Sequence, residues 1–308
     1  MAKQALVSII SVNFNETEAT LEMLRSLKKT TYASTEVIVV DNGSRENPEE
    51  KILAEFPDVL FIRSNVNLGF AGGNNLAVAR SNGDFLFFIN NDTVVGPGLI
   101  SGLVGQFSKI EKLGAISPKI YYHPDMVKGE TQMIQYAGTT EVNTITGRNR
   151  TLGEKEIDTG QFTTEVETPY VHGAAMMISR EVLEKVGPLP EVFFLYYEEL
   201  DWCEKIRRAG FKVFIDPSVF IYHKESLAVG GDSPLKVYFQ TRNRLLFMRR
   251  NQAGLRLVIF ALFLILFTVP KNLLKYTLAG KWDHIKAFTK GIFWNLNHPK
   301  DRVSALGW

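Results

Sequence analysis

Short apolar stretches, each followed by a polar turn and a helical pattern, recur through the N-terminal part of the chain. The first stretch, 6–12, precedes Leu21, Leu24 and Leu27, which repeat at helical spacing. The alternating strands and helices that this pattern predicts are 6–12, 19–29, 36–40, 48–56, 59–62, 72–81 and 85–89. Such alternation predicts an α/β fold with a mostly parallel sheet flanked by helices on both faces.

The pattern loosens after Pro97 and then becomes regular again. We expect hairpins and loops over 120–168, where Thr, Gly and Asn are frequent. The elements predicted around this region are helices over 99–110 and 199–208 and strands over 174–178, 213–215 and 219–222. Gly230, Gly231 and Pro234 then indicate a boundary. We therefore expect a catalytic domain over 1–230 and a helical region over 231–308.

The net charge of +2 conceals an asymmetry between these two parts. From Lys236 onward the chain carries thirteen Lys and Arg but only Asp283 and Asp301 as acids. A basic tail on an acidic body suggests a polyanionic partner, either a membrane surface or a nucleic acid. Cys203 is the only cysteine, which excludes an intramolecular disulfide and suits a reducing compartment.

Polar residues follow directly after the predicted strands. Ligands of open parallel sheets bind at the carboxyl ends of the strands, so these positions are the first candidates for a site. They are Asn13, Asn15, Asp41, Asn42, 65–69 (with Asn67 and Gly69), Asn90, Asn91 and Asp92. The glycines of NLGFAGGNN lack the spacing and place of a dinucleotide fingerprint, which counts against a nicotinamide dehydrogenase.

Asn90, Asn91 and Asp92 end a strand that reads as fully buried, FLFFI. Carboxylate and amide oxygens suit Mg²⁺ or Mn²⁺, and such a cation also binds a diphosphate. The alternative is that NNDT only turns the chain, because Asn and Asp favour turns through local hydrogen bonds. The same two interpretations apply to Asp41 in VVDNGS.

Six blocks together resemble the inverting family 2 glycosyltransferases of GT-A fold, especially bacterial rhamnosyltransferase-like members. The blocks are VSIISVNFN, EVIVVDNGS, NLGFAGGNN, FLFFINNDT, VHGAAMMISREV and FFLYYEELDWCEKIRRAGFKV, in this order over about 5–225. The resemblance implies that Asp41 binds the nucleobase and that Gly173 lies beside donor and acceptor. It also implies that Asn90 and Asp92 stand at the DxD metal motif, with Asn90 in place of the first carboxylate, and that His223 contacts the metal. Without this resemblance, a single His after a strand is more often a residue with no functional role.

The helix that contains EELDWCEKIRRAG carries the candidate base. Glu199, Trp202, Cys203 and Ile206 share its apolar face. Glu198, Asp201, Glu204, Lys205 and Arg208 are expected on the opposite, solvated face. An inward carboxylate has a raised pKa, as a general base for a sugar hydroxyl requires, although a salt bridge to a structural Arg is the alternative. The family resemblance implies that the base is Glu199, with Asp201 as the second candidate.

The tail contains thirteen uncharged residues, 257–269, all apolar except Thr268. At about 1.5 Å per residue they extend about 20 Å, which is short of the hydrocarbon core. With Arg249, Arg250, Lys271, Lys275, Trp282 and Trp294 around it, the segment fits a helix that lies in the interface of an anionic leaflet. A buried core helix, a homodimer contact or a re-entrant hairpin are alternatives. The tail has no nucleic-acid-binding signature.

These observations predict a glycosyltransferase at the cytoplasmic face of the plasma membrane, and the family resemblance implies that it is an inverting one. It would transfer a sugar such as rhamnose from a UDP- or dTDP-sugar, with a divalent cation, to a saccharide or lipid-linked saccharide. A sugar nucleotidyltransferase is an alternative, but NFNETE lacks the Gly-rich, basic triphosphate loop that it requires. A catalytically silent, membrane-recruited nucleotide-sugar-binding protein is the other alternative.

Overall fold

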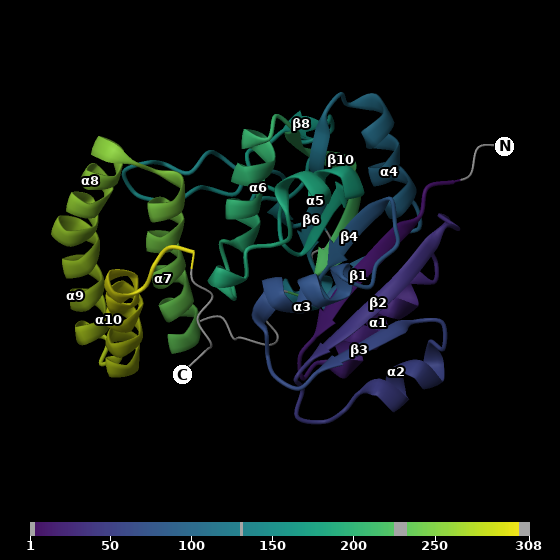
Figure 1. Cartoon of the computed structure of the whole chain (residues 1–308), viewed down its shortest axis with the longest axis horizontal. Helices are drawn as coiled ribbons and strands as arrows, with labels where there is room; N and C mark the ends of the chain where they lie inside the picture. The colour runs from purple at the N-terminus through teal and green to yellow at the C-terminus, as the bar shows by residue number, and fades with distance from the viewer. Residues whose placement is uncertain (1–3, 130–131, 225–232, 302–308) are drawn as a thin grey trace.

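The computed structural model describes residues 4–129, 132–224 and 233–301. Within these residues, ten strands form one sheet whose main path is β3-β2-β1-β4-β9-β6-β10-β5, with β7 beside β6 and β8 beside β10 (Figure 1). The strands are β1 Val7–Asn13, β2 Thr35–Asn42, β3 Leu60–Ser64, β4 Phe85–Ile89, β5 Thr93–Val95, β6 Leu113–Tyr122, β7 Ile134–Tyr136, β8 Val166–Glu167, β9 Ala175–Ser179 and β10 Lys212–His223. Strands β1 to β4 are parallel, as predicted.

Helices cover both faces of this sheet because its central strands are apolar on both sides. Ile9 and Phe87 pack with α1, α2 and α4, whereas their neighbours Ile10 and Phe88 pack with α3, α5 and α6. The helices are α1 Thr17–Leu27, α2 Glu49–Glu55, α3 Gly69–Val78, α4 Leu99–Lys109, α5 Arg180–Val186 and α6 Glu198–Arg208, with 3₁₀ turns at Pro124–Met126 and Glu191–Phe193. The predicted α/β architecture is confirmed.

Several strands differ from the sequence prediction, and one of them, β5 (Thr93–Val95), follows directly after the predicted NND turn. Strand β6 was not predicted, because Gly114 and Pro118 interrupt its apolar pattern. The two strands predicted over 213–215 and 219–222 are one strand, β10, with an irregularity between Asp216 and Phe220 where its register against β6 shifts. Strand β9 runs antiparallel between β4 and β6. The carboxyl edge of the sheet therefore brings together the ends of β1, β2, β4, β6 and β10 and the loop before β9.

The C-terminal part is a group of helices beside the sheet (Figure 1). They are α7 Pro234–Asn251, α8 Gly254–Phe263, a π-helical turn Leu264–Thr268, α9 Val269–Leu278 and α10 Trp282–Asn297. The hydrophobic core beneath α6 continues into this group through Leu246, Phe260 and Trp294. The predicted boundary at Gly230 and Gly231 lies outside the described residues, so the division at 230 stays a prediction.

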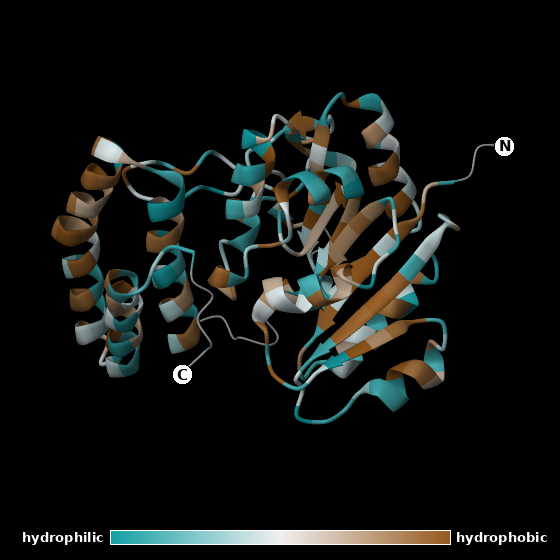
Figure 2. Cartoon of the chain, in the orientation of Figure 1, coloured by the Kyte–Doolittle hydropathy of each residue, from teal (hydrophilic) through white to brown (hydrophobic). Residues whose placement is uncertain are grey.

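The apolar tail segment is longer as a helix than its sequence suggests. Helix α8, the π-helical turn and α9 form one helix over Gly254–Leu278, which is 25 residues long and, by length and composition alone, apolar enough to cross a membrane. Its outer face is apolar (Figure 2). The exposed apolar side chains on it are Leu255, Val258, Ile259, Leu262, Ile265, Leu266, Phe267, Leu274 and Leu278.

Three residues expected at a membrane surface serve the packing of the tail instead. Trp294 is buried, stacks on His298 and lies 4.4 Å from the Arg242 guanidinium. Arg249 donates to Asn295, and Arg250 pairs with two acidic side chains. The interfacial prediction for Arg249, Arg250 and Trp294 was therefore wrong, because a sequence shows composition but not which face of α7 and α10 is covered. Trp282, Lys271 and Lys275 are exposed as expected.

Candidate active site

Asp92 and His223 meet at the carboxyl edge of the sheet because β5 pairs antiparallel with β10. Thr93 lies opposite His223 in this ladder, so the residue before β5 adjoins the last residue of β10. Asp92 Oδ1 lies 3.1 Å from His223 Nε2, and the two side chains are 11% and 5% exposed. The structure therefore brings together the two residues that the sequence predicts as metal ligands.

Gln135, on β7, determines which nitrogen of His223 carries the proton. His223 Nδ1 lies 2.9 Å from Gln135 Oε1, an oxygen that only accepts hydrogen bonds. In the neutral ring, Nε2 then directs its lone pair towards Asp92 Oδ1, which is buried and accepts no hydrogen bond from the described residues. Carboxylates and backbone or amide oxygens commonly orient a metal-binding His in this way.

The geometry of this pair fits a divalent cation. Two lone pairs that face each other at 3.1 Å repel unless a proton or a cation lies between them. Adjacent ligands of an octahedral cation with bonds of about 2.1 Å are about 3 Å apart. No group of three or more His, Cys, Asp or Glu able to hold a metal occurs among the described residues. A cation at Asp92 and His223 would therefore need further oxygen ligands from a substrate.

The neighbours of Asp92 divide between the two interpretations of the NNDT segment. Asn90 places Nδ2 3.3 Å from His223 Nε2 and so faces the site. Asn91 donates instead to Thr20 Oγ1 at 3.0 Å, which ties the turn to α1. Gly173 lies in the loop before β9, where the carbonyl of Ala174 accepts from the backbone N–H of Asn90. Asn90 thus lies beside the Asp92–His223 pair, Gly173 lies in a loop bonded to Asn90 through the next residue, and Asn91 shapes the turn.

Asp41 is fully buried at the end of β2. Asn13 Nδ2 donates to its Oδ1 at 2.9 Å, and Arg63 Nε lies 3.8 Å from its Oδ2. Asn15 has a positive φ of 59° and accepts from the backbone N–H of Arg45. These contacts hold the loops after β1 and β2 together, and Asp41 is oriented by Asn13, which the sequence pattern indicated, and by Arg63, which it did not.

Asn67 and Gly69 form the turn between β3 and α3. Asn67 Oδ1 accepts from the backbone N–H of Gly69 at 2.8 Å. Gly69 has a φ of 74°, and a Cβ there would lie 2.3 Å from the carbonyl oxygen of Phe194. A side chain at position 69 would therefore displace the segment that leads into α6. The predicted donor contacts of Asn67 and Gly69 stay predictions, but Gly69 lies directly against the segment that leads into α6.

The turn before α6 has an unusual backbone. Phe194, Tyr196 and Tyr197 all have positive φ, between 65° and 75°, which costs about 1–3 kcal/mol for each such residue. Asn243 on α7 offsets this cost, since its Nδ2 lies 2.7 to 2.9 Å from the carbonyl oxygens of residues 193, 195 and 196. Arg242 donates to the carbonyls of residues 192 and 193. Helix α7 thus determines where α6 begins.

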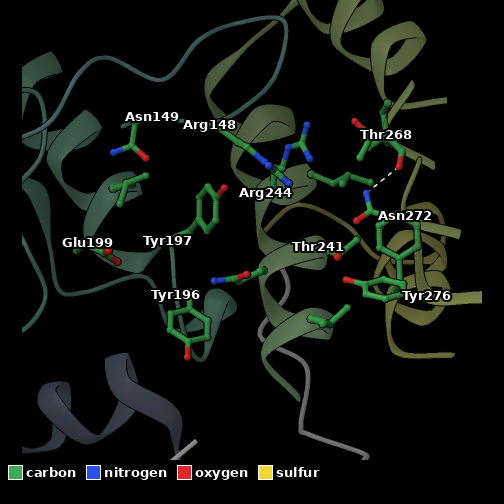
Figure 3. Close-up of a pocket in the computed structure, with 16 residues that line it drawn as sticks. Arg148, Asn149, Tyr196, Tyr197, Glu199, Thr241, Arg244, Thr268, Asn272 and Tyr276 are labelled. Carbon is green, nitrogen blue, oxygen red and sulfur yellow. Dashed lines mark hydrogen bonds between the residues drawn. The ribbon is translucent and has the colours of Figure 1, made fainter. Parts of the chain in front are cut away.

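Glu198 and Glu199 follow this turn directly. Glu199 is half-buried and lines a cavity of about 420 Å³ between α6, α7 and the Gly254–Leu278 helix (Figure 3). Burial raises the pKa of Glu199 to about 7. Burial, together with the charge of Glu199, also raises the pKa of Glu198 well above its usual value. Glu198 Oε2 has no hydrogen-bond partner among the described residues.

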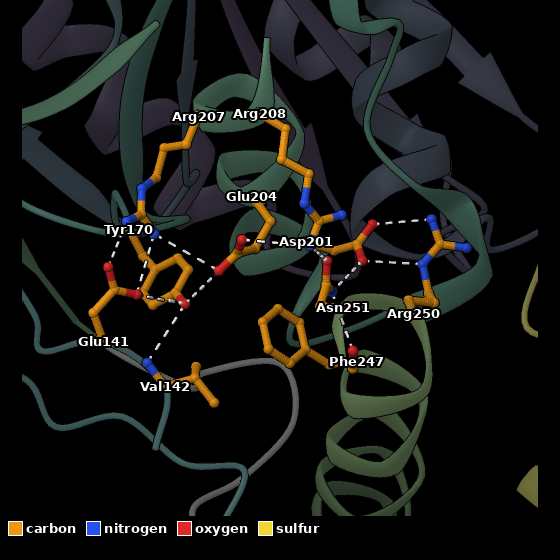
Figure 4. Close-up of polar contacts among 10 residues, drawn as sticks. All are labelled: Glu141, Val142, Tyr170, Asp201, Glu204, Arg207, Arg208, Phe247, Arg250 and Asn251. Atoms are coloured by element: carbon orange, nitrogen blue, oxygen red, sulfur yellow. Dashed lines mark hydrogen bonds and ion pairs between the residues drawn. The ribbon is translucent and has the colours of Figure 1, made fainter. Parts of the chain in front are cut away.

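The predicted solvated face of α6 was wrong for its first turn. Glu198 and Asp201 are 4% and 2% exposed, because α7 packs over the side of α6 opposite the sheet. Asp201 forms two parallel bonds of 3.0 Å with Arg250 and accepts from Asn251 (Figure 4). Glu204 and Lys205 are half-buried, and Arg208 is exposed. The structural salt bridge considered for Glu199 therefore belongs to Asp201, which leaves Glu199 the better placed base.

The residues that line the cavity of Glu199 do not include Asp92 or His223, so the cavity and the Asp92–His223 pair are separate features of the structure. A sugar between them would need to contact both parts at once. His172 lies near the Asp92–His223 pair, with its ring centroid 6.1 Å from that of His223. Burial, with a smaller contribution from His223, lowers the pKa of His172 to about 3.

Comparison with known proteins assigns this chain to a family. The model of "Glycosyl transferase family 2" matches residues 8–187, which is more than half of the chain. The chain therefore belongs to glycosyltransferase family 2 and is a glycosyltransferase. The matched residues contain β1 to β9 and end before α6, so the match contains Asp92 but neither Glu199 nor His223.

Individual relatives agree with this assignment. The low-salt glycan biosynthesis hexosyltransferase Agl10 of Haloferax volcanii is 28% identical over 78% of this chain and 74% of its own. The N-acetylglucosaminyl-diphospho-decaprenol L-rhamnosyltransferase of Mycobacterium tuberculosis is 20% identical over 81% and 86%. The mannosyltransferase PcManGT of Pyrobaculum calidifontis, solved with GDP-Man and Mn²⁺, superposes with a TM-score of 0.58 at 16% identity over 96% and 88%. The expected GT-A fold is confirmed.

Several site residues were not identified from the sequence. His172 directly precedes Gly173 within a block that carries the family resemblance, so its position was a usable signal. Gln135 and Arg63 lie in stretches without a motif, and only the strand pairing brings them to the site. Arg242 and Asn243 are in a helix that reads as part of a basic tail.

We predict that transfer depends on pH through Glu199. A general base must be deprotonated, so kcat/KM should fall about tenfold per pH unit below about pH 7 and level off above it. Glu199→Gln should lower the rate on the order of 10² to 10⁴ and remove this dependence. Steady-state rates between pH 5 and 9 test the prediction. A pH limb that persists in Glu199→Gln but disappears in Asp201→Asn would assign the base to Asp201.

Proposed function

We propose that this protein transfers a sugar, with inversion, from a UDP- or dTDP-sugar to a saccharide or lipid-linked saccharide during cell-surface polysaccharide synthesis. The observation that carries the proposal is the Asp92–His223 pair, 3.1 Å apart, at the carboxyl edge of a family 2 fold. Rhamnose is the proposed sugar because a relative that aligns with 81% of the chain is named a rhamnosyltransferase.

The donor side of the reaction needs charge neutralisation. Asp92 and His223 would hold Mg²⁺ or Mn²⁺ together with the donor diphosphate, and PcManGT is a structural neighbour solved with Mn²⁺ and a nucleotide sugar. The cation, when bound, would offset the negative charge that grows on the leaving diphosphate. Asp41, with Asn13 and Arg63 around it, would bind the nucleoside part at the ends of β1 to β3.

Glu199 would accept the proton of the attacking hydroxyl. Its half-buried carboxylate faces a cavity large enough for a sugar, and a pKa of about 7 leaves much of it ionised at neutral pH. An acceptor in this cavity would attack the sugar from the side opposite the diphosphate. Such a single displacement inverts the anomeric centre.

We also propose that the outer face of the Gly254–Leu278 helix lies in the interface of the cytoplasmic leaflet. The inner face of this helix carries Phe260, Leu264 and Thr268, which are buried against the rest of the protein. A transmembrane arrangement would draw the polar cavity wall and Arg244, whose guanidinium lies over the Phe260 ring, into hydrocarbon. A helix in the membrane plane keeps that wall intact, and exposed Lys271, Lys275 and Trp282 suit an anionic surface.

Metal-dependent donor binding tests the catalytic proposal. We expect UDP or dTDP to bind more tightly with Mn²⁺ than without it. Asp92→Ala should lower the affinity measured with Mn²⁺ at least tenfold and abolish transfer. Titration calorimetry measures the affinity, and release of nucleotide diphosphate from a panel of nucleotide sugars measures turnover. The matched control is Asp58→Ala, which changes an exposed Asp.

Equal affinity with and without Mn²⁺, or native turnover in Asp92→Ala, would contradict the metal site. Metal-dependent binding without turnover of any sugar nucleotide would favour the catalytically silent alternative, for which Asn90 in place of a carboxylate is the specific observation.

Membrane binding has its own test. We expect the paired substitution Leu262→Glu and Leu266→Glu to release the protein from anionic liposomes, because each change puts a charge on the outer apolar face. Flotation with phosphatidylglycerol vesicles measures the bound fraction. Val66→Glu, at an exposed apolar residue of the catalytic domain, is the control. Native flotation of the paired variant would exclude this face as the anchor.

A further inference from the structure

The cavity beside Glu199 is lined by the start of α6 and by the Gly254–Leu278 helix. Glu199 and Tyr197 contribute from the start of α6, while Thr268 and Asn272 contribute from the Gly254–Leu278 helix. Arg148 and Arg244 also line it, and Figure 3 shows their side chains converging near Tyr197. Neither arginine forms an ion pair with a carboxylate of the described residues. The cavity therefore holds two positive charges that the described residues do not neutralise.

Arg244 is held firmly in this position. Arg244 is only 6% exposed. Its Nε donates to the carbonyl of Thr146 at 2.7 Å, and its guanidinium lies 5.7 Å from the Phe260 ring centroid. Burial and the adjacent charge of Arg148 lower the pKa of Arg244 to about 10. A buried charge beside a like charge is costly unless an anion binds both.

The position of Arg148 and Arg244 beside the Gly254–Leu278 helix indicates which kind of anion would bind them. Thr268 and Asn272 form the cavity wall on one side of that helix, and the exposed Leu262, Ile265 and Leu266 lie on its outer side. A lipid in the leaflet could place its head group in the cavity without leaving the apolar face. Guanidinium groups present paired N–H donors that match phosphate oxygens.

We propose that Arg148 and Arg244 bind the phosphate groups of the lipid carrier to which the acceptor sugar is attached. The carrier chain then leaves along the Gly254–Leu278 helix, and the sugar hydroxyl lies towards Glu199. This inference rests on the proposed function and specifies its acceptor as a lipid-linked saccharide. The donor diphosphate occupies a different place, because the cavity lining lacks Asp92 and His223.

Binding of phosphate probes to the full-length protein tests this site. The probes are farnesyl diphosphate, farnesol and inorganic pyrophosphate, and UDP and dTDP with Mn²⁺ serve as separate donor probes. We expect farnesyl diphosphate to bind more tightly than either farnesol or pyrophosphate. Arg148→Gln and Arg244→Gln should each weaken farnesyl diphosphate on the order of tenfold, as for loss of a charged hydrogen bond, and leave nucleotide affinity unchanged.

The controls separate the site from its surroundings. Arg150→Gln removes an exposed arginine of the same loop that does not line the cavity, and it should bind all probes as the native protein does. Arg148 is itself exposed, so Arg148→Gln keeps the test decisive if Arg244→Gln fails to fold.

Each contrary outcome has a distinct meaning. Equal binding of farnesol and farnesyl diphosphate, or equal loss in Arg150→Gln, would overturn the phosphate site. Binding of pyrophosphate as tight as that of farnesyl diphosphate would overturn the lipid assignment in favour of a free anion. Loss of UDP or dTDP affinity in the arginine variants would assign the pair to the donor. Native protein that binds no nucleotide would defeat the proposed function and leave the farnesyl diphosphate result standing.

Discussion

The contact between Asn243 and the strained turn before α6 is the constraint on which the rest of the active site depends. Three aromatic residues in that turn have positive φ, and one buried amide bonds the carbonyls around them. Without these bonds the turn would relax and α6 would begin elsewhere. Glu199 would then no longer face the cavity. The helical tail therefore supports the turn that precedes Glu199, and it also carries the exposed apolar face for which we propose membrane contact.

The position of charge follows from the same packing. Helix α6 lies between the sheet and α7, so both of its faces are covered at its first turn. Asp201 is paired with Arg250, whereas Glu199 forms no ion pair with the residues that the structure describes, and burial raises its pKa. Two carboxylates that are two residues apart thus acquire different roles. Arg148 and Arg244 present the complementary case, since neither forms an ion pair with a carboxylate in the described part of the chain, and we propose that a ligand neutralises them.

The parts of the fold and of the candidate site that depend on local sequence patterns were predictable from the sequence. The alternation from β1 to β4 predicted the parallel sheet, and the rule that ligands bind at carboxyl ends led to Asp41, Asn90 and Asp92. The family resemblance led to Glu199 and His223. What was missed depends on contacts between distant segments. Gln135 orients His223 only because β7 joins the sheet edge, and the burial of Asp201 and Trp294 depends on how α7 packs. Periodicity within one helix does not report such contacts.

The kinetics of Asn243→Ala show whether α7 positions Glu199 as the base. In a variant that still melts cooperatively and binds UDP or dTDP with native affinity, we expect kcat to fall on the order of 10²-fold, since a displacement of about 1 Å is enough for such a loss. A native kcat in that variant would show that the turn before α6 does not control the position of Glu199.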